Sequence, residues 1–295
     1  MMPKTLKHIP RGNLFVSEPN PQWFGNPPNE KNNPNWDTTT SNNWLKSRFH
    51  FSFAEYSSAS NSNFGVLRVM NDDFVQPDRG FGTHGHQNME IITYIVQGKL
   101  THKDSMGTEE SLGRGSVQFM TAGRGVQHSE FNLEKDKPLR FIQTWIVPRE
   151  RGLMPNYGSF DPSQSSSANA CTARNQWRHL ASDIQDKSTD TPVQIEQDAN
   201  LFVAELNDGQ TLDFQLKENR MAYALCVEGS VKLQDGNGEV VLQRHDGCEI
   251  KPDEKDGKLT FEAIGSEKVE DGSELAAHVL VFEMANVEGS GRKDL

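Results

Sequence analysis

The sequence predicts an all-β chain that folds as two tandem β-barrels, and three observations support this fold class. Between residues 80 and 147, short runs rich in β-branched and aromatic residues alternate with glycine turns. The same rhythm returns between about residues 201 and 284. The length of 295 residues exceeds the needs of one small barrel and suits two domains with separate cores. Strands this short and this regularly interrupted are typical of sandwiches and barrels.

The first barrel is expected to begin where the composition changes. Residues 17–43 are dominated by Asn, Pro, Trp, Gly, Ser and Thr and show neither a helical nor a strand period. Phe49, Phe51 and Phe53 then alternate with polar or small residues, as in a half-buried strand. We therefore expect an irregular N-terminal arm over residues 1–43 and a first barrel over residues 44–160.

A repeat within the chain predicts the second barrel. After Pro148 the chain is rich in Ser, Asn, Gln and Pro, which predicts a connector that we place at residues 161–200. Residues 94–100 and 224–231 share an order of apolar strand, polar residue, glycine and new strand. A duplicated barrel explains this echo economically, so we expect a second barrel over residues 201–295.

Composition and charge exclude several classes of protein. The net charge of −11 and the pI near 5.3, without a local basic cluster, disfavour direct nucleic-acid binding. The cysteines Cys171, Cys226 and Cys248 show no close pairing, which excludes a zinc ribbon and suits a reducing compartment. No apolar run approaches the roughly 20 residues that span a bilayer, and no secretory signal is recognised. We expect a cytoplasmic protein without a membrane segment.

Two short segments predict a metal site in the first barrel. Side chains at i and i+2 of a strand share a face, so His84 pairs with His86 and His128 pairs with Glu130. Histidines with one carboxylate form the set that non-haem iron(II) sites use, and zinc, nickel, manganese, cobalt or copper can occupy similar sets. One histidine pair alone is weak evidence, because a strand can also place such a pair for packing. Glu90 has the same strand parity as His84 and His86, so the residues leave the choice of carboxylate open.

The wider motif resembles known families. His84-Gly85-His86 with Glu90, followed by Gly125, His128 and Asn132, resembles the two-part signature of the cupin fold. The chain resembles the pirin family in residues 44–54 and in three further segments: Phe81-Gly82-Thr83-His84-Gly85-His86, Asp104-Ser105-Met106-Gly107 and residues 120–130. This resemblance implies a bicupin, two tandem jelly-roll cupin barrels, with one divalent metal, iron(II) foremost, in the first. It assigns the ligands to His84, His86, His128 and Glu130, and leaves Glu90 as a residue that supports them.

The remaining histidines are expected to have structural roles. His102 lies at a strand end and is expected to be hydrogen-bonded, and His245 is expected in a turn. No partner pattern surrounds four others, namely His8, His50, His179 and His278. The second barrel contains neither of the motifs HxH and HxE, so we expect it to bind no metal.

The resemblance implies quercetin 2,3-dioxygenase activity, in which a flavonol and O₂ yield a cleaved ester and carbon monoxide. Glu130 would be the base that accepts the proton of the flavonol hydroxyl. A second hypothesis is that of a metal-dependent redox sensor which binds a transcription factor or another protein partner, in the nucleus as in eukaryotic pirins. In a third, the metal mainly stabilises the fold.

Overall fold

The structure is a computed structural model of the chain, and it describes residues 6–27, 44–164, 174–251, 257–270 and 272–286. In these ranges strands are joined by turns and by 3₁₀ helices of three or four residues. None of the described helices is long and apolar enough to cross a membrane. The all-β fold class is therefore confirmed.

Contacts divide the chain into two compact units. The unit that we call N-terminal comprises Phe15–Ser62 and Val69–Asp161. The C-terminal unit comprises Met1–Leu14, Asn63–Arg68 and Pro162–Leu295. The domain boundaries expected from the sequence stay predictions.

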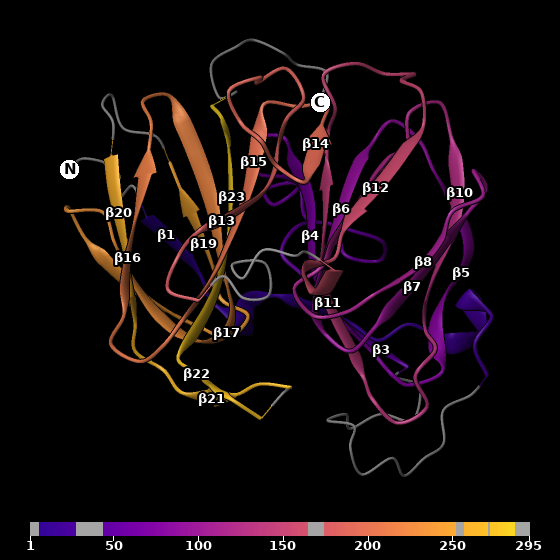
Figure 1. Cartoon of the computed structure of the whole chain (residues 1–295), viewed down its shortest axis with the longest axis horizontal. Helices are drawn as coiled ribbons and strands as arrows, with labels where there is room; N and C mark the ends of the chain where they lie inside the picture. The colour runs from indigo at the N-terminus through magenta and orange to yellow at the C-terminus, as the bar shows by residue number, and fades with distance from the viewer. Residues whose placement is uncertain (1–5, 28–43, 165–173, 252–256, 271, 287–295) are drawn as a thin grey trace. The chain divides into compact units, whose positions relative to one another are not determined.

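The segment expected to be an irregular arm contains regular structure where it is described. Strand β1 (Leu6–Ile9) pairs antiparallel with β19 (Gly247–Ile250), and β2 (Phe15–Ser17) pairs with β3 (Leu45–Phe49). In Figure 1 the indigo β1 accordingly lies among the orange and yellow strands of the C-terminal unit. Lys7 Nζ also lies 2.9 Å from an oxygen of Glu249, so an ion pair adds to the backbone pairing.

Two sheets form the N-terminal unit, as in a jelly roll. The larger has the order β12-β9-β6-β11-β4-β3-β2 and the smaller the order β5-β10-β7-β8, so neither closes on itself. The bounds of the larger sheet's remaining strands are β4 (Leu67–Val75), β6 (Glu90–Gln97), β9 (Val117–Thr121), β11 (Leu139–Ile146) and β12 (Asn156–Phe160). Those of the smaller sheet are β5 (Arg79–His86), β7 (Leu100–Asp104), β8 (Glu109–Leu112) and β10 (Val126–Asn132).

An apolar cluster stabilises the N-terminal unit. Its buried members come from both sheets and the segment before β3: Trp44, Leu45, Val75, Ile95, Leu100, Leu112, Leu139 and Phe141. Burying one large apolar side chain contributes about 1.5–3 kcal/mol, so this cluster is a main source of the unit's stability.

The C-terminal unit is built around one long strand, β17 (Arg220–Gln234). It belongs to the order β1-β19-β17-β23-β15-β13-β14 and also pairs with β18 and β20, while β16 pairs with β20. The other strands are β13 (Arg178–Asp183), β14 (Val193–Ile195), β15 (Ala199–Leu206), β16 (Thr211–Leu216), β18 (Glu239–Gln243), β20 (Gly257–Ala263), β21 (Glu267–Lys268), β22 (Glu274–Leu275) and β23 (Ala277–Ala285). Cys226 and Cys248 are buried in its core as thiols that form no disulfide among the described residues, and Cys171 lies outside these residues.

The sequence echo between the two units has a structural counterpart. Gly98 has a φ of +74° and Gly229 a φ of +68°. A Cβ atom on Gly98 would lie 2.4 Å from the carbonyl oxygen of Pro138, and one on Gly229 would lie 2.0 Å from that of Ala276. Both turns therefore require glycine for conformation and for close backbone approach, which supports the duplicated barrel.

Candidate metal centre

The pairing of β5 and β10 brings the two predicted histidine segments together. The strands are antiparallel, with His128 opposite His84 and Val126 opposite His86. The register shifts between His128 and Glu130, and Glu130 lies opposite Phe81. The segments around His84 and His128, more than 40 residues apart in the sequence, thus lie on neighbouring strands.

Three histidine rings converge at this place. Ligand atoms of His84, His86 and His128 all lie within 4.8 Å of one another. The ring centroids are 4.4 Å apart for His84 and His128, and 4.8 Å apart for each of the other two pairs. Three of the four predicted ligands therefore form one compact group.

The hydrogen bonds of the rings indicate which nitrogens are available. Nδ1 of His84 lies 2.8 Å from the carbonyl oxygen of Gly82, so it carries the proton and donates. Nε2 of His84 is then left with a lone pair. In the described part of the chain, Nε2 of His128 is buried and has no hydrogen-bond partner. A buried nitrogen of this kind is costly without a partner, and a metal ion would provide one, so these residues fit a divalent ion.

The electrostatics of the group keep two rings neutral. Burial, together with the charges that His128 and His84 would carry, lowers the pKa of His86 to about 3. Burial, together with His84 and His102, lowers the pKa of His128 to about 3. Metal ligation requires neutral imidazole, so at neutral pH both rings are already in the required state.

Glu130 is buried and held by two amides. Gln118 Nε2 donates to Oε1 of Glu130 at 3.2 Å, and Gln143 Nε2 lies 3.2 and 3.1 Å from its two oxygens. Each amide is anchored in turn. The hydroxyl of Tyr157 lies 3.1 Å from Oε1 of Gln118, and Nε1 of Trp145 lies 3.1 Å from Oε1 of Gln143. Side chains from three other strands, β9, β11 and β12, therefore fix the orientation of the carboxylate.

The two candidate carboxylates differ in position. Glu130 shares a group of ligand atoms within 4.8 Å with His128 and His102, and not with His84 and His86. Glu90 is absent from the groups found among the described residues, and it accepts a hydrogen bond of 2.9 Å from Thr121. The ligand role of Glu130 stays a prediction.

The strand parity of Glu90 is misleading for a structural reason. It assumes one strand from His84 to Glu90, but β5 ends at His86 and β6 begins at Glu90. Asn88 has a φ of +54° in the turn between them, and β6 belongs to the other sheet. Equal parity therefore does not place Glu90 with the histidines.

His102 and Asp104 extend the histidine group. The rings of His102 and His128 approach with their Nδ1 atoms 3.4 Å apart, and Nε2 of His102 lies 3.2 Å from Oδ2 of Asp104. The expectation that His102 is hydrogen-bonded is confirmed. Burial acts to raise the pKa of Asp104, but bonds from the Thr108 backbone, His102 and the Met106 backbone outweigh it and lower the pKa. In the sequence, this contact is indicated only by the spacing of His102 and Asp104, which places both side chains on the same face of one strand.

Asp73 is a further buried carboxyl group, and it was not among the predicted site residues. Burial raises the pKa of Asp73 to about 8, the neighbouring Ser47 side chain opposes the rise, and the charges of Asp72 and Glu130 add to it. Asp73 is therefore largely protonated at neutral pH. Two adjacent acids inside the apolar β4 were the signal, since ordinary strands do not bury such a pair.

The C-terminal unit also contains a group of potential ligands. Ligand atoms of Glu205, Glu228 and His278 lie within 4.8 Å of one another, and all three residues are buried. Nδ1 of His278 lies 2.8 Å from Oε2 of Glu228, and Nε of Arg174 lies 3.3 Å from Oε2 of Glu205. The contact between Arg174 and Glu205 is an ion pair, and that between His278 and Glu228 becomes one when His278 is protonated. The three residues come from three strands and share no sequence motif that would identify the group. The metal-free second barrel stays a prediction.

Other histidines lie in separate settings. His245 is in a turn with a φ of +75°, as expected. Nε2 of His8 lies 3.0 Å from Asp246, and Nε2 of His179 lies 2.9 Å from Asn200. Neither belongs to a group of potential ligands among the described residues.

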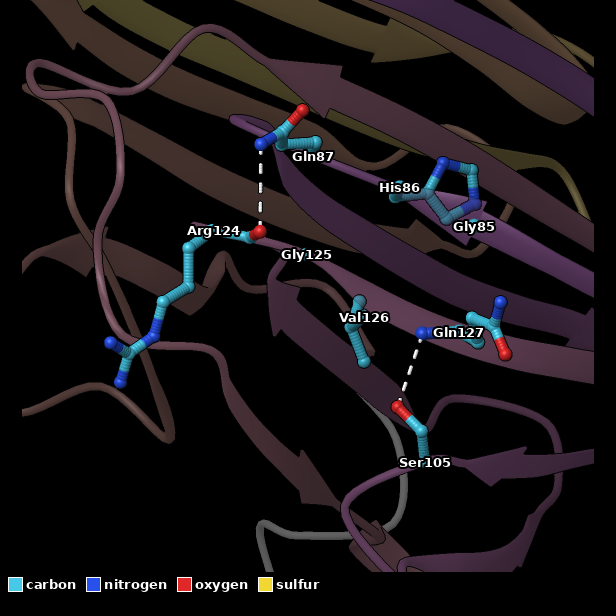
Figure 2. A pocket seen from close by; sticks show the side chains of 8 residues that line it. All are labelled: Gly85, His86, Gln87, Ser105, Arg124, Gly125, Val126 and Gln127. Atoms are coloured by element: carbon cyan, nitrogen blue, oxygen red, sulfur yellow. Dashed lines mark hydrogen bonds between the residues drawn. The ribbon is translucent and has the colours of Figure 1, made fainter.

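An open hollow of about 460 Å³ lies beside His86 (Figure 2). Gln87 Nε2 lies 3.5 Å from the carbonyl oxygen of Arg124, and the backbone N–H of Gln127 donates to Ser105 Oγ at 3.2 Å. The remaining lining residues are Gly85, Gly125 and Val126. A ligand in the hollow would contact one of the three converging histidines.

Comparisons with known proteins agree with this architecture. The Pirin family model matches residues 33–146, and the model of the quercetinase C-terminal cupin domain matches residues 179–284. A pirin-like protein of Caulobacter vibrioides is 39% identical over 209 residues, which cover 70% of this chain and 84% of that protein. A quercetin 2,3-dioxygenase of Escherichia coli is 37% identical over 193 residues, 64% of this chain and 77% of that protein.

The comparison of structures covers both units. The crystal structure of the bacterial pirin YhhW from Escherichia coli in complex with nickel(II) has a TM-score of 0.71 and 26% identity. The match covers 96% of this chain and 100% of that chain. Two cupin domains in tandem are thereby confirmed.

Proposed function

The chain belongs to the pirin family, and from this premise we propose that it is a metal-dependent dioxygenase that cleaves a flavonol such as quercetin with O₂ and releases carbon monoxide. The observation that carries the proposal is the convergence of His84, His86 and His128, with a buried unpartnered Nε2 on His128. A relative named quercetin 2,3-dioxygenase supports the choice of reaction.

Four residues of this chain would hold one divalent ion: His84, His86, His128 and Glu130. Iron(II) is our first choice, because histidines with one carboxylate are the set that non-haem iron(II) sites use. Nickel, manganese, cobalt, copper and zinc are the alternatives. The bound ion supplies Lewis acidity, which lowers the pKa of the flavonol hydroxyl and favours an electron-rich substrate for O₂.

Glu130 is the residue that we assign as base. Its carboxylate would accept the proton of the flavonol 3-hydroxyl, and a base must lie within hydrogen-bond reach of that proton. Gln118 and Gln143 keep the carboxylate oriented through the bonds described above. Because Glu130 is buried, water is largely kept from the group that takes up the proton.

The aromatic substrate would enter from the hollow beside His86. The ring of Trp145 stands edge-on to His86, with centroids 4.7 Å apart and planes at 83°. Trp145 is not a lining residue of the hollow, so its ring would hold His86 in place beside the substrate. The hollow is open and has a volume of about 460 Å³.

A quercetin assay tests the proposal. The loss of the visible absorbance of quercetin in air is followed with protein loaded with iron(II), nickel, manganese, cobalt, copper or zinc in turn. Turnover is expected with at least one metal, its abolition in His128→Ala and a strong loss in Glu130→Gln. The matched control is His179→Ala, because His179 is a half-buried, hydrogen-bonded histidine of the C-terminal unit.

Two results would contradict the proposal. Absence of turnover with every metal in the series removes the dioxygenase activity. Full turnover by Glu130→Gln removes the assignment of the base. The redox-sensing hypothesis with a protein partner stays a prediction.

A further inference from the structure

A chain of three buried side chains runs away from the proposed metal site. His128 contacts His102 through the two Nδ1 atoms, 3.4 Å apart. His102 contacts Asp104 through Nε2 and Oδ2, 3.2 Å apart. The side chains of His102 and Asp104 are 1% and 0% exposed. The chain therefore ends on a carboxylate that solvent does not reach.

The protons along this chain can be placed from its far end. Oδ1 of Asp104 accepts from the backbone N–H groups of Met106 and Thr108, at 2.8 and 3.0 Å. The carboxylate can only accept, so Nε2 of His102 carries the proton. We take the neutral form of His102, whose single N–H is then on Nε2, so that its Nδ1 is an acceptor. Nδ1 of His128 must then be the donor of the 3.4 Å contact.

We propose that Asp104 and His102 are positioning residues that hold His128 in the tautomer protonated on Nδ1, so that its Nε2 presents a lone pair to a divalent metal. This inference rests on the proposed metal site. The buried Nε2 of His128, which has no hydrogen-bond partner in the described part of the chain, is the atom that this tautomer leaves free. His84 reaches the same tautomer through a different partner, the carbonyl oxygen of Gly82.

The surroundings of His102 hold the chain in place. In the register of β7 and β10, His102 lies opposite Glu130 and Asp104 lies opposite His128. The ring of Tyr157 stacks on His102, with centroids 4.5 Å apart and planes at 22°. A flip of the His102 ring by 180° would keep this stacking and break both hydrogen bonds, and a smaller rotation would break the stacking too. Partners of this kind orient a ligand histidine and fix its tautomer.

The first test reads the tautomer directly in the metal-free protein. Two-bond ¹H–¹⁵N correlation spectra distinguish a ring protonated on Nδ1 from one protonated on Nε2. Wild-type His128 is expected to be protonated on Nδ1. In Asp104→Asn, the Asn oxygen would keep the two backbone bonds and the amide NH₂ would face His102. That donor reverses the chain, so His128 is expected to become protonated on Nε2.

The second test measures zinc(II) affinity by competition with a chromophoric chelator. Asp104→Asn and His102→Leu are expected to weaken zinc binding by about 10- to 100-fold, as losses of such supporting partners do. Asp235→Asn is the matched control, because Oδ1 of Asp235 also accepts two backbone N–H groups, at 2.9 and 2.8 Å, in an exposed turn. Its affinity should equal that of the wild type.

Three results would overturn the inference. The first is wild-type His128 protonated on Nε2. The second is a zinc affinity that is unchanged in both Asp104→Asn and His102→Leu. If Asp104→Asn does not fold, an unchanged affinity in His102→Leu alone is the deciding result. The third is complete loss of zinc binding in His102→Leu, equal to that in His128→Ala, which would make His102 a ligand. None of these readouts depends on turnover, so failure of the quercetin assay would remove the dioxygenase activity and leave the tautomer test intact.

Discussion

Gln143 donates from one amide nitrogen to both oxygens of Glu130, at 3.2 Å to Oε1 and 3.1 Å to Oε2. Oε1 of Gln143 accepts from the indole N–H of Trp145 at 3.1 Å, so the amide cannot turn over without losing a bond. The carboxylate assigned as base is therefore held by an amide that is itself held.

We expect Gln143→Leu to reduce quercetin turnover by about 10- to 100-fold, because Glu130 loses a donor that fixes its orientation. The measurement is kcat/KM on protein with equal metal content. Gln215→Leu is the control, since Gln215 is an exposed strand residue of the C-terminal unit. Wild-type turnover in Gln143→Leu would show that the amide does not position the base.

The pair of Asp72 and Arg140 predicts a large effect on stability. Arg140 Nε and Nη2 lie 2.8 and 2.7 Å from the two oxygens of Asp72, and both side chains are 1% exposed. Asp72→Ala would remove the carboxylate that accepts from two nitrogens of the buried guanidinium. Loss of about 3–5 kcal/mol in the free energy of unfolding is expected, measured with urea.

The control for this prediction is an exposed pair of the same unit. Nζ of Lys135 lies 2.7 Å from Asp78, with side chains 75% and 54% exposed. Lys135→Ala should change stability little, because exposed ion pairs are screened by water and salt. Equal effects of Asp72→Ala and Lys135→Ala would contradict the assigned role of burial.

Asp73 predicts a dependence of stability on pH. Its pKa is raised in the folded state to about 8, against 3.8 in a free side chain. Between these values the folded state retains a proton that the unfolded state has lost. The stability from this group is therefore fully present below about pH 4 and is lost as the pH rises through about 8, by at most about 1.4 kcal/mol per pH unit.

Asp73→Asn isolates this contribution because the amide does not titrate. The variant should gain stability relative to the wild type as the pH rises from about 5 to about 8. Urea unfolding of both metal-free proteins across this range measures the difference, and the other titrating groups cancel in it. Parallel curves would show that Asp73 does not hold a proton in the folded state.

Short-range patterns predicted part of this structure and long-range pairing decided the rest. The i, i+2 spacing of His84 and His86 predicted a shared face, and the register of β5 and β10 brings His128 to it. The same rule does not apply to Glu90, because side chains alternate regularly only within one strand, and a turn separates Glu90 on β6 from the histidines on β5. Gln143 comes from β11, whose position depends on sheet order rather than on any local motif.

The N-terminal strand illustrates the same limit. Residues 6–9 carry no pattern that identifies their partner, yet β1 pairs with β19, more than 230 residues away. Such pairing is set by the free edge of a sheet and by contacts such as that between Lys7 and Glu249. The residues next to β1 in the sequence reveal neither the sheet edge nor Glu249, so the pairing could not be predicted from them.

The number of bound metal ions tests whether only the N-terminal unit binds metal. We expect one equivalent of metal per chain, lost in His84→Ala and retained in Glu228→Gln, because Oε2 of Glu228 already has Nδ1 of His278 as a partner at 2.8 Å. Elemental analysis of desalted protein measures this. Two equivalents in the wild type, or loss of metal in Glu228→Gln, would contradict the expectation that the second cupin domain binds none.

The most direct test of the central claim is the anomalous diffraction of crystals of the metal-loaded protein, recorded on both sides of the absorption edge of the metal. The prediction is one peak at about 2 Å from a ring nitrogen of each of His84, His86 and His128, with Glu130 beside it. A peak bound instead by His102, or no peak within reach of the three histidines, would contradict the account.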